Sequence, residues 1–497
     1  MSAVRPETRL GLHVLAGAAM LGVVGDLLLR AMPLGLNAFL CATTLVALAV
    51  WLVRRHRVPV SPDTPWLAAA ALLVASNFVA RDSAALHALD AIGLVIILAV
   101  AMLSLRGGTL RGRQAWDYAR TALDAAATAC IGVFPLIGRD IAWSEVSGGA
   151  RLGRARGVAL GAVVAFPLLI VFGTLFASAD VVFRDLVTQA FAVDFGALLS
   201  HTVLIAVFAT LAAGYFRGAL LRRVSSAGEG SGFSVGIVPV ATALGLVDAL
   251  FLVFVVIQLR YLFGGAQLIA TATGLTYAEY ARRGFFELVT ATALTLPLLV
   301  TADCVLRNES RERQRTFRHL AVVLLLLLVV VMASALERMR LYVDAFGLSE
   351  IRLYSTAVML YLAGVCAWFA WTTLRGERRR FAFGALVQGF AVLAGLHLVN
   401  PDAFIVRTNL ARPAAGRPFD GRYAASLGAD AVPLLLDALP RLAPPEQCRV
   451  AHGLVVRRTT LEHDDWRTWN FARTMARRLL HDQGERLRTV ACPASRP

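Results

Sequence analysis

Long apolar stretches recur through the first 400 residues of the chain, and they limit its fold more than any other feature. Each stretch is about 20 residues long, the length that an α-helix needs to cross the hydrocarbon core of a bilayer. Short connections rich in arginine separate them. The pattern predicts an all-α fold, a polytopic bundle of transmembrane helices.

The composition supports this interpretation. Of the 497 residues, 58% are hydrophobic and 16% are charged, whereas soluble domains carry about 25% charged residues. A soluble enzyme, a disordered chain and a fibrous repeat are therefore excluded. The net charge is +16, but the arginines gather between apolar runs, as retention on the cytoplasmic side requires. We expect membrane lipids as partners and no nucleic acid. Arginine-rich, lysine-free usage is typical of a GC-rich bacterium, so the predicted location is the bacterial inner membrane.

We predict eleven spans, with a cytoplasmic N-terminus and an extracytoplasmic C-terminus. Segment 118–138 is also apolar but contains Arg120 and Asp124, and a charge at mid-membrane costs roughly 2.5–3.5 kcal/mol. If it lies on the surface as an amphipathic helix, cytoplasmic loops hold 25 arginines against 9 on the opposite side before the C-terminal tail. The positive-inside rule favours that arrangement. The spans, which form domain 1–400, are approximately 10–31, 34–53, 65–81, 86–105, 155–178, 197–216, 235–259, 284–305, 318–336, 353–374 and 381–400.

Residues 401–497 are soluble in character, with 15 arginines, 10 acidic residues and several prolines. They predict a small α-helical extracytoplasmic domain. Its last long helix, 466–483, places four apolar residues on one face at helical spacing: Trp469, Ala472, Met475 and Leu479.

Two of the six cysteines, Cys448 and Cys492, lie in this exported segment. An oxidising compartment favours a disulfide between them, and two free thiols are the alternative. Their spacing matches no zinc-ligand pattern, so neither a metal nor a cofactor is predicted.

Acidic residues inside the spans are candidates for function, because burying charge in a membrane is costly. Asp248 lies in the middle of its span and is the strongest of them. Asp26, Asp90, Glu287 and Asp303 lie nearer to span ends. A proton or cation path is one interpretation, and hydrogen bonds to neighbouring helices are the other.

The connection from Glu337 to Tyr354 carries three acidic residues and three arginines. Arg338 and Arg340 are suited to bind a carboxylate or phosphate, whereas an ordinary solvated helix is the alternative. Standard catalytic signatures are absent, including phosphate-binding loops and metalloprotease motifs.

Several segments together resemble the bacterial multi-pass membrane proteins grouped as the domain of unknown function 4153/4173. The resemblance covers roughly residues 155–440 and implies no activity. The segments that carry it are Glu337–Tyr354, Gly173–Asp180, Tyr277–Glu287, Asn400-Pro-Asp402 with Asn409, and Asp430-Ala-Val-Pro433.

Three functions are consistent with these features. The first is a transporter for a small polar or ionic solute, which a deep cavity lined by Asp248 would favour. The second is a membrane-embedded enzyme acting on lipid-linked substrates, which a shallow outer pocket with facing acids and arginines would favour. The third is a scaffold or sensor that presents the C-terminal domain. The candidate polar cluster, expected on the outer face, comprises Glu279, Glu287, Glu337, Arg338, Arg340, Tyr342, Glu350, Arg352, Asn400 and Asp402.

Overall fold

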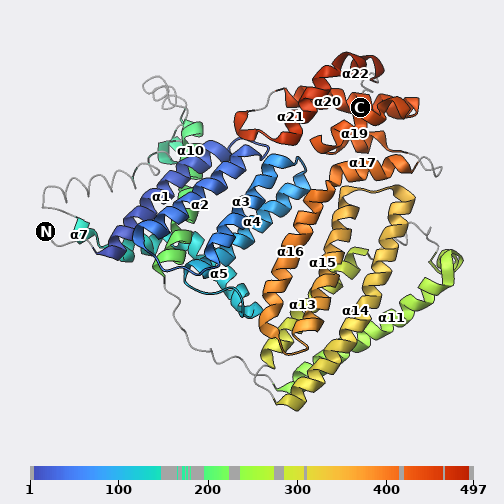
Figure 1. Cartoon of the computed structure of the whole chain (residues 1–497), viewed down its shortest axis with the longest axis horizontal. Coiled ribbons are helices and arrows are strands. Elements are labelled where there is room, and N and C mark those ends of the chain that lie inside the picture. Colours follow the sequence, from blue (N-terminus) through green and yellow to red (C-terminus); the bar gives the residue numbers. More distant parts are fainter. Residues whose placement is uncertain are drawn as a thin grey trace.

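The described part of the chain is helical throughout its regular structure (Figure 1). The computed structural model describes residues 5–146, 195–222, 236–273, 285–306, 310–412, 419–462 and 465–491, with a few residues between 165 and 180. Within these ranges nine helices are long and apolar enough to cross a membrane, or ten if one bent pair is a span. The chain is a polytopic membrane protein, and the all-α prediction is confirmed.

The nine helices are α1 (Pro6–Leu29), α2 (Leu36–His56), α4 (Ala84–Leu105), α10 (Phe195–Phe216), α11 (Ile237–Thr273), α13 (Phe285–Val305), α14 (Arg311–Phe346), α15 (Glu350–Thr372) and α16 (Arg378–Val399). Helix α3 (Thr64–Ala80) occupies the predicted span 65–81 but is shorter than the others. The predicted span 155–178 lies largely outside the described residues. Eleven spans therefore stays a prediction.

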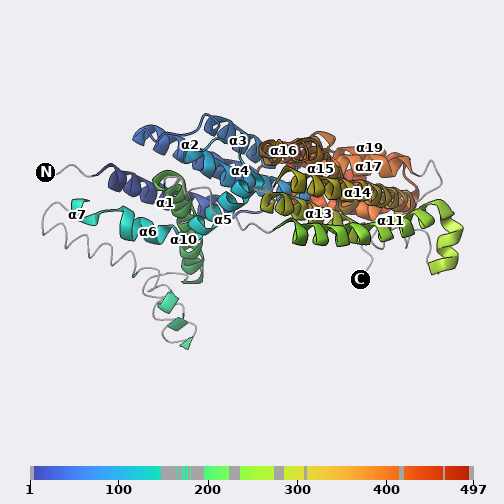
Figure 2. The same cartoon turned by 90° about the horizontal axis from the view of Figure 1, so that it is seen from below.

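The helices form two groups that α16 joins. In the first, α1 packs against α10 and α2, and α3 packs against α4. In the second, α14 is central and contacts α11, α13 and α15. Helix α16 packs against α15 and also against α4 (Figures 1 and 2). Close packing within the first group depends on small residues: a Cβ atom on Gly22 would lie 2.6 Å from the carbonyl oxygen of Ile205.

Helix α5 (Ala115–Ile131) covers the predicted surface segment and bends by 60° into residues 133–140. Near its start, Tyr118 donates to the carbonyl oxygen of Leu110 in the connection that follows α4, and in its middle Asp124 pairs with Arg106 at the end of α4. Beyond the bend, Ile141 packs with Leu10 in the first turns of α1. Both ends of the segment therefore meet the same end of the bundle, an arrangement that a surface helix shares with a re-entrant pair, so the surface placement stays a prediction.

The C-terminal helices pack across the other end of the bundle (Figure 1). Asn400 adopts a left-handed conformation (φ 55°), which turns the chain out of α16, and Pro401 begins the next helix. A separate apolar core includes Val450, Leu454 and Leu480, all fully buried. The elements are α17 (Pro401–Ala411), α18 (Gly421–Ser426), the 3-10 turn η4 (Ala429–Ala431), α19 (Val432–Ala438), η5 (Leu439–Arg441), α20 (Pro444–Leu461), η6 (Trp466–Thr468), α21 (Phe471–Asp482) and α22 (Gly484–Val490).

The predicted apolar face of the last long helix is wrong. Trp469 and Met475 are 42% and 45% exposed, and the α-helix begins only at Phe471. The buried face carries Ala472, Ala476 and Leu480 together with Arg473. The sequence pattern missed this face because it counted only apolar residues, whereas a buried arginine sets the orientation of α21.

The cysteines divide as expected between the two parts of the chain. Cys448 is disulfide-bonded, and Cys41, Cys130, Cys304 and Cys366 are free. Cys492, its predicted partner, lies outside the described residues, so that pairing stays a prediction.

We call the end of the bundle that carries the C-terminal helices the docked end, and the other the opposite end. The docked end contains the connections 30–35, 81–83 and 347–349. The positive-inside rule predicts that the docked end faces outward.

Single cysteines test this orientation in a chain whose four free cysteines are replaced by serine. We expect Thr316→Cys, at the opposite end, to react with a membrane-impermeant maleimide only after the membrane is opened. Thr489→Cys, in α22, should react in intact cells. Labelling of both positions from the same side would contradict the predicted topology.

Candidate functional site

A group of charged residues joins the C-terminal helices to the bundle, and we call Arg81, Asp82, Asp402, Asp430 and Arg473 the junction cluster. Arg81 and Asp82 lie in the short connection between α3 and α4. Asp430 accepts hydrogen bonds from the backbone N–H of Asp82 (2.7 Å) and from Arg81 Nη1 (3.1 Å). In return, Asp82 Oδ2 accepts one from the backbone N–H of Ala429 (3.2 Å). Asp430 therefore accepts from the backbone of the connection between α3 and α4, and Asp82 accepts from the backbone of η4.

Arg473 brings a buried positive charge to this junction, with only 2% of its surface exposed. Its Nη1 atom lies 2.9 Å from Asp82 Oδ1. Its Nη2 atom donates to the carbonyl oxygens of Leu34 (3.0 Å) and Thr468. A buried guanidinium requires such partners, because unpaired charge is strongly disfavoured away from water.

Asn470 fastens the same helix by a second route. Its amide donates to the carbonyl oxygens of Phe78 (2.8 Å) and Arg81 (2.6 Å). Its side-chain oxygen accepts from the backbone N–H of Arg473 and so caps α21. The start of α21 is thus bound to the end of α3.

Asp402 lies in the first turn of α17 and is 1% exposed. Its Oδ2 atom accepts a hydrogen bond from the backbone N–H of Gly428 (3.0 Å), and its Oδ1 atom has no hydrogen-bond partner among the described residues. A Cβ atom on Gly428 would lie 2.4 Å from Asp402 Oδ2 and 1.9 Å from the carbonyl oxygen of Asp82. Only glycine leaves room for this approach.

The junction cluster holds more acidic residues than arginines. Burial and the negative charges of Glu350, Asp430 and Asp82 together raise the pKa of Asp402 to about 7. Burial also raises the pKa of Asp82, against the opposing effect of Arg473. Asp402 is therefore a carboxyl group that exchanges a proton near neutral pH.

Several acids predicted inside the spans bind neighbouring helices near the docked end. Asp90 is fully buried, lies 3.0 Å from His397 Nε2 and accepts from Asn77 Nδ2 (3.0 Å). Asp26 lies 2.6 Å from His201 Nδ1. These contacts agree with the second interpretation of the acids, in which they form hydrogen bonds to neighbouring helices.

The remaining intramembrane acids differ in their surroundings. Asp303 pairs with Arg378 at 2.9 Å. Asp248 is 7% exposed, and neither of its carboxylate oxygens has a hydrogen-bond partner among the described residues. Asp248 thus keeps its place as a candidate for function.

The structure brings part of the predicted polar cluster together. Asn400 donates to Asp430 (3.2 Å) and so joins the junction cluster. The backbone N–H of Glu350 donates to the hydroxyl of Tyr423 (2.9 Å). Arg352 places its guanidinium 4.0 Å from the ring centroid of Tyr342, a cation–π contact. With Asp402, these residues lie at the docked end.

Other members of the predicted cluster lie apart from the junction. Arg340 is exposed and pairs at 3.9 Å with Glu337 of its own helix. Arg338 donates to Gln258 Oε1 (2.7 Å), and Glu287 is exposed on α13. Glu279 lies outside the described residues, so its place in the cluster stays a prediction.

A pocket of about 590 Å³ opens beside the junction, and we call it the arginine pocket. Its wall combines the end of α14 with α18 and α20. The residues that line it are Ala345, Phe346, Arg412, Phe419, Asp420, Arg422, Glu446 and Arg449. Three arginines and two acidic residues therefore contribute to this wall.

Both carboxylates of this pocket are engaged by the protein. Asp420 accepts from the backbone N–H of Tyr423 (3.0 Å) and caps α18. Glu446 accepts from the backbone N–H of Gly421 (2.8 Å) and also pairs with Arg449. Arg422 is exposed and has no ion-pair partner in the described part of the chain. The pocket therefore offers positive charge to a ligand.

Sequence reasoning missed Arg81, Asp82 and Arg473. The charged pair Arg81-Asp82 between two apolar spans was an available signal. No such signal distinguishes Arg473 in the sequence, since it is one of several arginines on α21. Among the described residues no group of acidic, histidine and cysteine side chains is arranged to hold a metal.

The model of a family described as a domain of unknown function (DUF4153) matches residues 68–438. The chain belongs to this family. Neither a curated protein nor a solved structure matches it. The matched range contains Arg81, Asp82, Asp402 and Asp430 but ends before Asn470 and Arg473.

Removing the buried cation should loosen the C-terminal helices. We expect Arg473→Ala to destabilise their docking by about 3–5 kcal/mol, because it leaves Asp82 buried without its charge partner. Limited proteolysis of the C-terminal segment measures this effect. Arg478→Ala, an exposed position on the same helix, should change protection little; equal losses in both variants would contradict the assigned role of Arg473.

Asp402 should make docking depend on pH. An acid with a raised pKa in the folded state binds more protons there than in the unfolded state, so stability falls as pH rises from about 4 through 7. The difference between 3.8 and about 7 corresponds to about 4 kcal/mol at most.

The variant Asp402→Asn should remove most of this dependence and raise the melting temperature at pH 8.5. Asp437→Asn, at an exposed position, should retain the wild-type profile. Melting curves between pH 5.5 and 8.5 provide the measurement, and identical profiles for wild type and Asp402→Asn would refute the assignment.

Proposed function

We propose that this membrane protein binds the phosphate-containing head group of a lipid or lipid-linked substrate at its docked end. The arginine pocket carries this proposal. Guanidinium groups form paired, charge-assisted hydrogen bonds to phosphate oxygens, and the volume of the pocket, about 590 Å³, is typical of small-molecule sites.

The position of the pocket supports a lipid-derived ligand. Phe346, the last residue of the membrane-spanning helix α14, lines the pocket and is 58% exposed. Phe419 provides a second aromatic wall. A ligand bound by the arginines would therefore have an apolar surface beside its head group, at the level where a span ends.

The pocket also connects with the acids of the junction. Arg422, on α18, lines the pocket. The following residue, Tyr423, donates its backbone N–H to Asp420 and accepts a hydrogen bond on its hydroxyl from the backbone N–H of Glu350. The charges of Glu350 and Asp402 in turn influence each other. These contacts connect a proton-exchanging carboxyl group with the proposed phosphate site, which favours the hypothesis of an enzyme acting on lipid-linked substrates.

Transport receives less support from this geometry. The arginine pocket is built from α14, the end of α17, α18 and α20, and Asp248 is not among its lining residues. Transport through a path that includes Asp248 stays a prediction.

Binding measurements on the purified full chain test the proposal. Native mass spectrometry should detect phosphatidylglycerol with higher affinity than phosphatidylcholine, and glycerol phosphate distinguishes a free head group from a lipid-anchored one. Arg422→Gln should weaken phosphatidylglycerol binding about tenfold, since it removes a charge-assisted hydrogen bond.

Arg488→Gln, an exposed arginine on α22, is the matched control and should bind as the wild type does. Wild-type affinity in Arg422→Gln, or an equal loss in both variants, would overturn the proposal. Strong binding of glycerol phosphate alone would retain the phosphate site but exclude a requirement for the lipid.

A further inference from the structure

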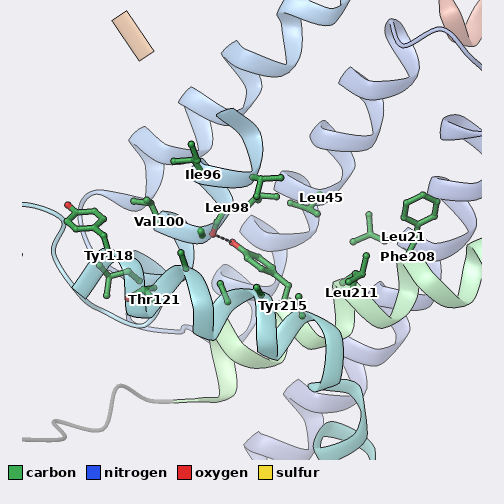
Figure 3. Close-up of a pocket in the computed structure, with 18 of the residues that line it drawn as sticks. Leu21, Leu45, Ile96, Leu98, Val100, Tyr118, Thr121, Phe208, Leu211 and Tyr215 are labelled. Carbon is green, nitrogen blue, oxygen red and sulfur yellow. Dashed lines mark hydrogen bonds between the residues drawn. The ribbon is translucent and has the colours of Figure 1, made fainter. Parts of the chain in front are cut away.

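Helix α1 has two faces that differ in exposure. Leu21 and Gly25 line an apolar pocket of about 690 Å³ that α1 shares with α2, α4, α5 and α10 (Figure 3), so this face is turned toward the bundle. Met20, Val23 and Leu27 are exposed. Their spacing places these three residues on one face of the helix, away from the pocket. An exposed apolar stripe on a membrane-spanning helix is the surface that contacts lipid.

The 3-10 turn η6 is attached at the docked end of this stripe. Arg467 Nη1 donates a hydrogen bond to the carbonyl oxygen of Leu27 (2.6 Å), in the last turn of α1. The backbone N–H of Leu36, the first residue of α2, donates to the carbonyl oxygen of Trp469 (2.9 Å). Helix α21, which follows η6, contacts α3 at the same end of the bundle (Figure 1). The segment therefore lies at the level where α1 ends and α2 begins.

Large apolar side chains are exposed on this segment, although the C-terminal helices have a buried core of their own. Between 42% and 63% of the surface of each is exposed, and they are Trp466, Trp469, Phe471 and Met475. Phe471 and Met475 lie one turn apart on the outer face of α21. The later residues of that face, Arg478 and Asp482, are charged. The exposed apolar residues are therefore those nearest to the ends of the spans.

We infer that η6 and the first two turns of α21 lie in the interfacial layer of the bilayer, where these four side chains contact lipid. Two observations favour lipid over a protein partner. Through the bond from Arg467 to Leu27 the four residues continue the lipid-facing stripe of α1, and they lie at the level where a span ends. Tryptophan is enriched at that level because its ring is apolar and its indole N–H is polar. Amphipathic helices bind lipid in this way, with the apolar face at the boundary between head groups and acyl chains.

Lipid contact gives the start of α21 a second attachment. The inner face of the helix is held to the bundle by the ion pair of Arg473 with Asp82. The outer face, with Phe471 and Met475, is held by the bilayer. None of the four exposed residues lines the arginine pocket, so this lipid-contacting surface is separate from the proposed phosphate site.

Fluorescence quenching in vesicles tests this placement. In the full chain whose four free cysteines are replaced by serine, Phe471→Cys and Met475→Cys each carry a nitrobenzoxadiazole label. Both leaflets contain phosphatidylcholine with a nitroxide near the top of its acyl chain, so the result does not depend on topology. We expect at least about three times the quenching of Asp482→Cys, because an interfacial helix buries its apolar face roughly 5–10 Å into the boundary where the nitroxide lies. Asp482, exposed in the last turn on the same face, is the matched control.

The two label positions keep the test decisive if one substitution impairs folding, and Val23→Cys provides the reference for full lipid contact. Equal quenching at positions 471 and 482, or quenching at neither 471 nor 475, would overturn the inference. So would cross-linking of two Phe471→Cys chains by a bismaleimide without quenching in vesicles, which would identify a second copy of the chain as the occupant of this surface.

Discussion

The buried ion pair between Arg473 and Asp82 is the contact on which the arrangement of the docked end depends. Arg473 comes from the C-terminal helices, and Asp82 from the connection between two spans. Neither charge tolerates burial without the other. The same guanidinium also reaches the carbonyl oxygen of Leu34 between α1 and α2. One side chain thus holds two bundle connections and α21 together.

Most of the fold was predictable from apolar length and arginine placement, whereas the site was predictable only in part. Runs of about 20 apolar residues locate spans because the bilayer thickness sets their length. The polar motif Asn400-Pro-Asp402 and the residue Asp430 were also identified, and both lie in the junction cluster. Arg473 was not, since its burial depends on a partner almost 400 positions away. Long-range pairing of this kind leaves no periodic signal.

In the segment from Glu337 to Tyr354, a high density of charge in the sequence does not correspond to a shared binding site. Its charges are dense in sequence, but two of its three arginines have local partners: Glu337 for Arg340, and the carbonyl oxygen of Gly347 and the ring of Tyr342 for Arg352. Arg338 instead donates to Gln258 of α11. Charge density alone does not distinguish a solvated helix from a binding surface. The arginine pocket acquires its positive character differently, because backbone N–H groups engage its two acids and leave Arg422 unpaired within the described residues.

The charge balance of the docked end accounts for the unusual carboxyl group at its centre. Asp82, Asp402, Asp430 and Glu350 are four acids in mutual electrostatic range, and three cations lie among them: Arg81, Arg457 and Arg473. The pKa of Asp402, raised to about 7, allows one of these acids to hold a proton near neutral pH. Asp402 is the acid that takes it because its Oδ2 atom has a backbone donor but no cation, whereas Asp82 and Asp430 each contact a guanidinium. Arg457 and Arg473 both lie beyond the range matched by the family, so the C-terminal helices supply two of these three cations, and the proton affinity of Asp402 is coupled to their docking.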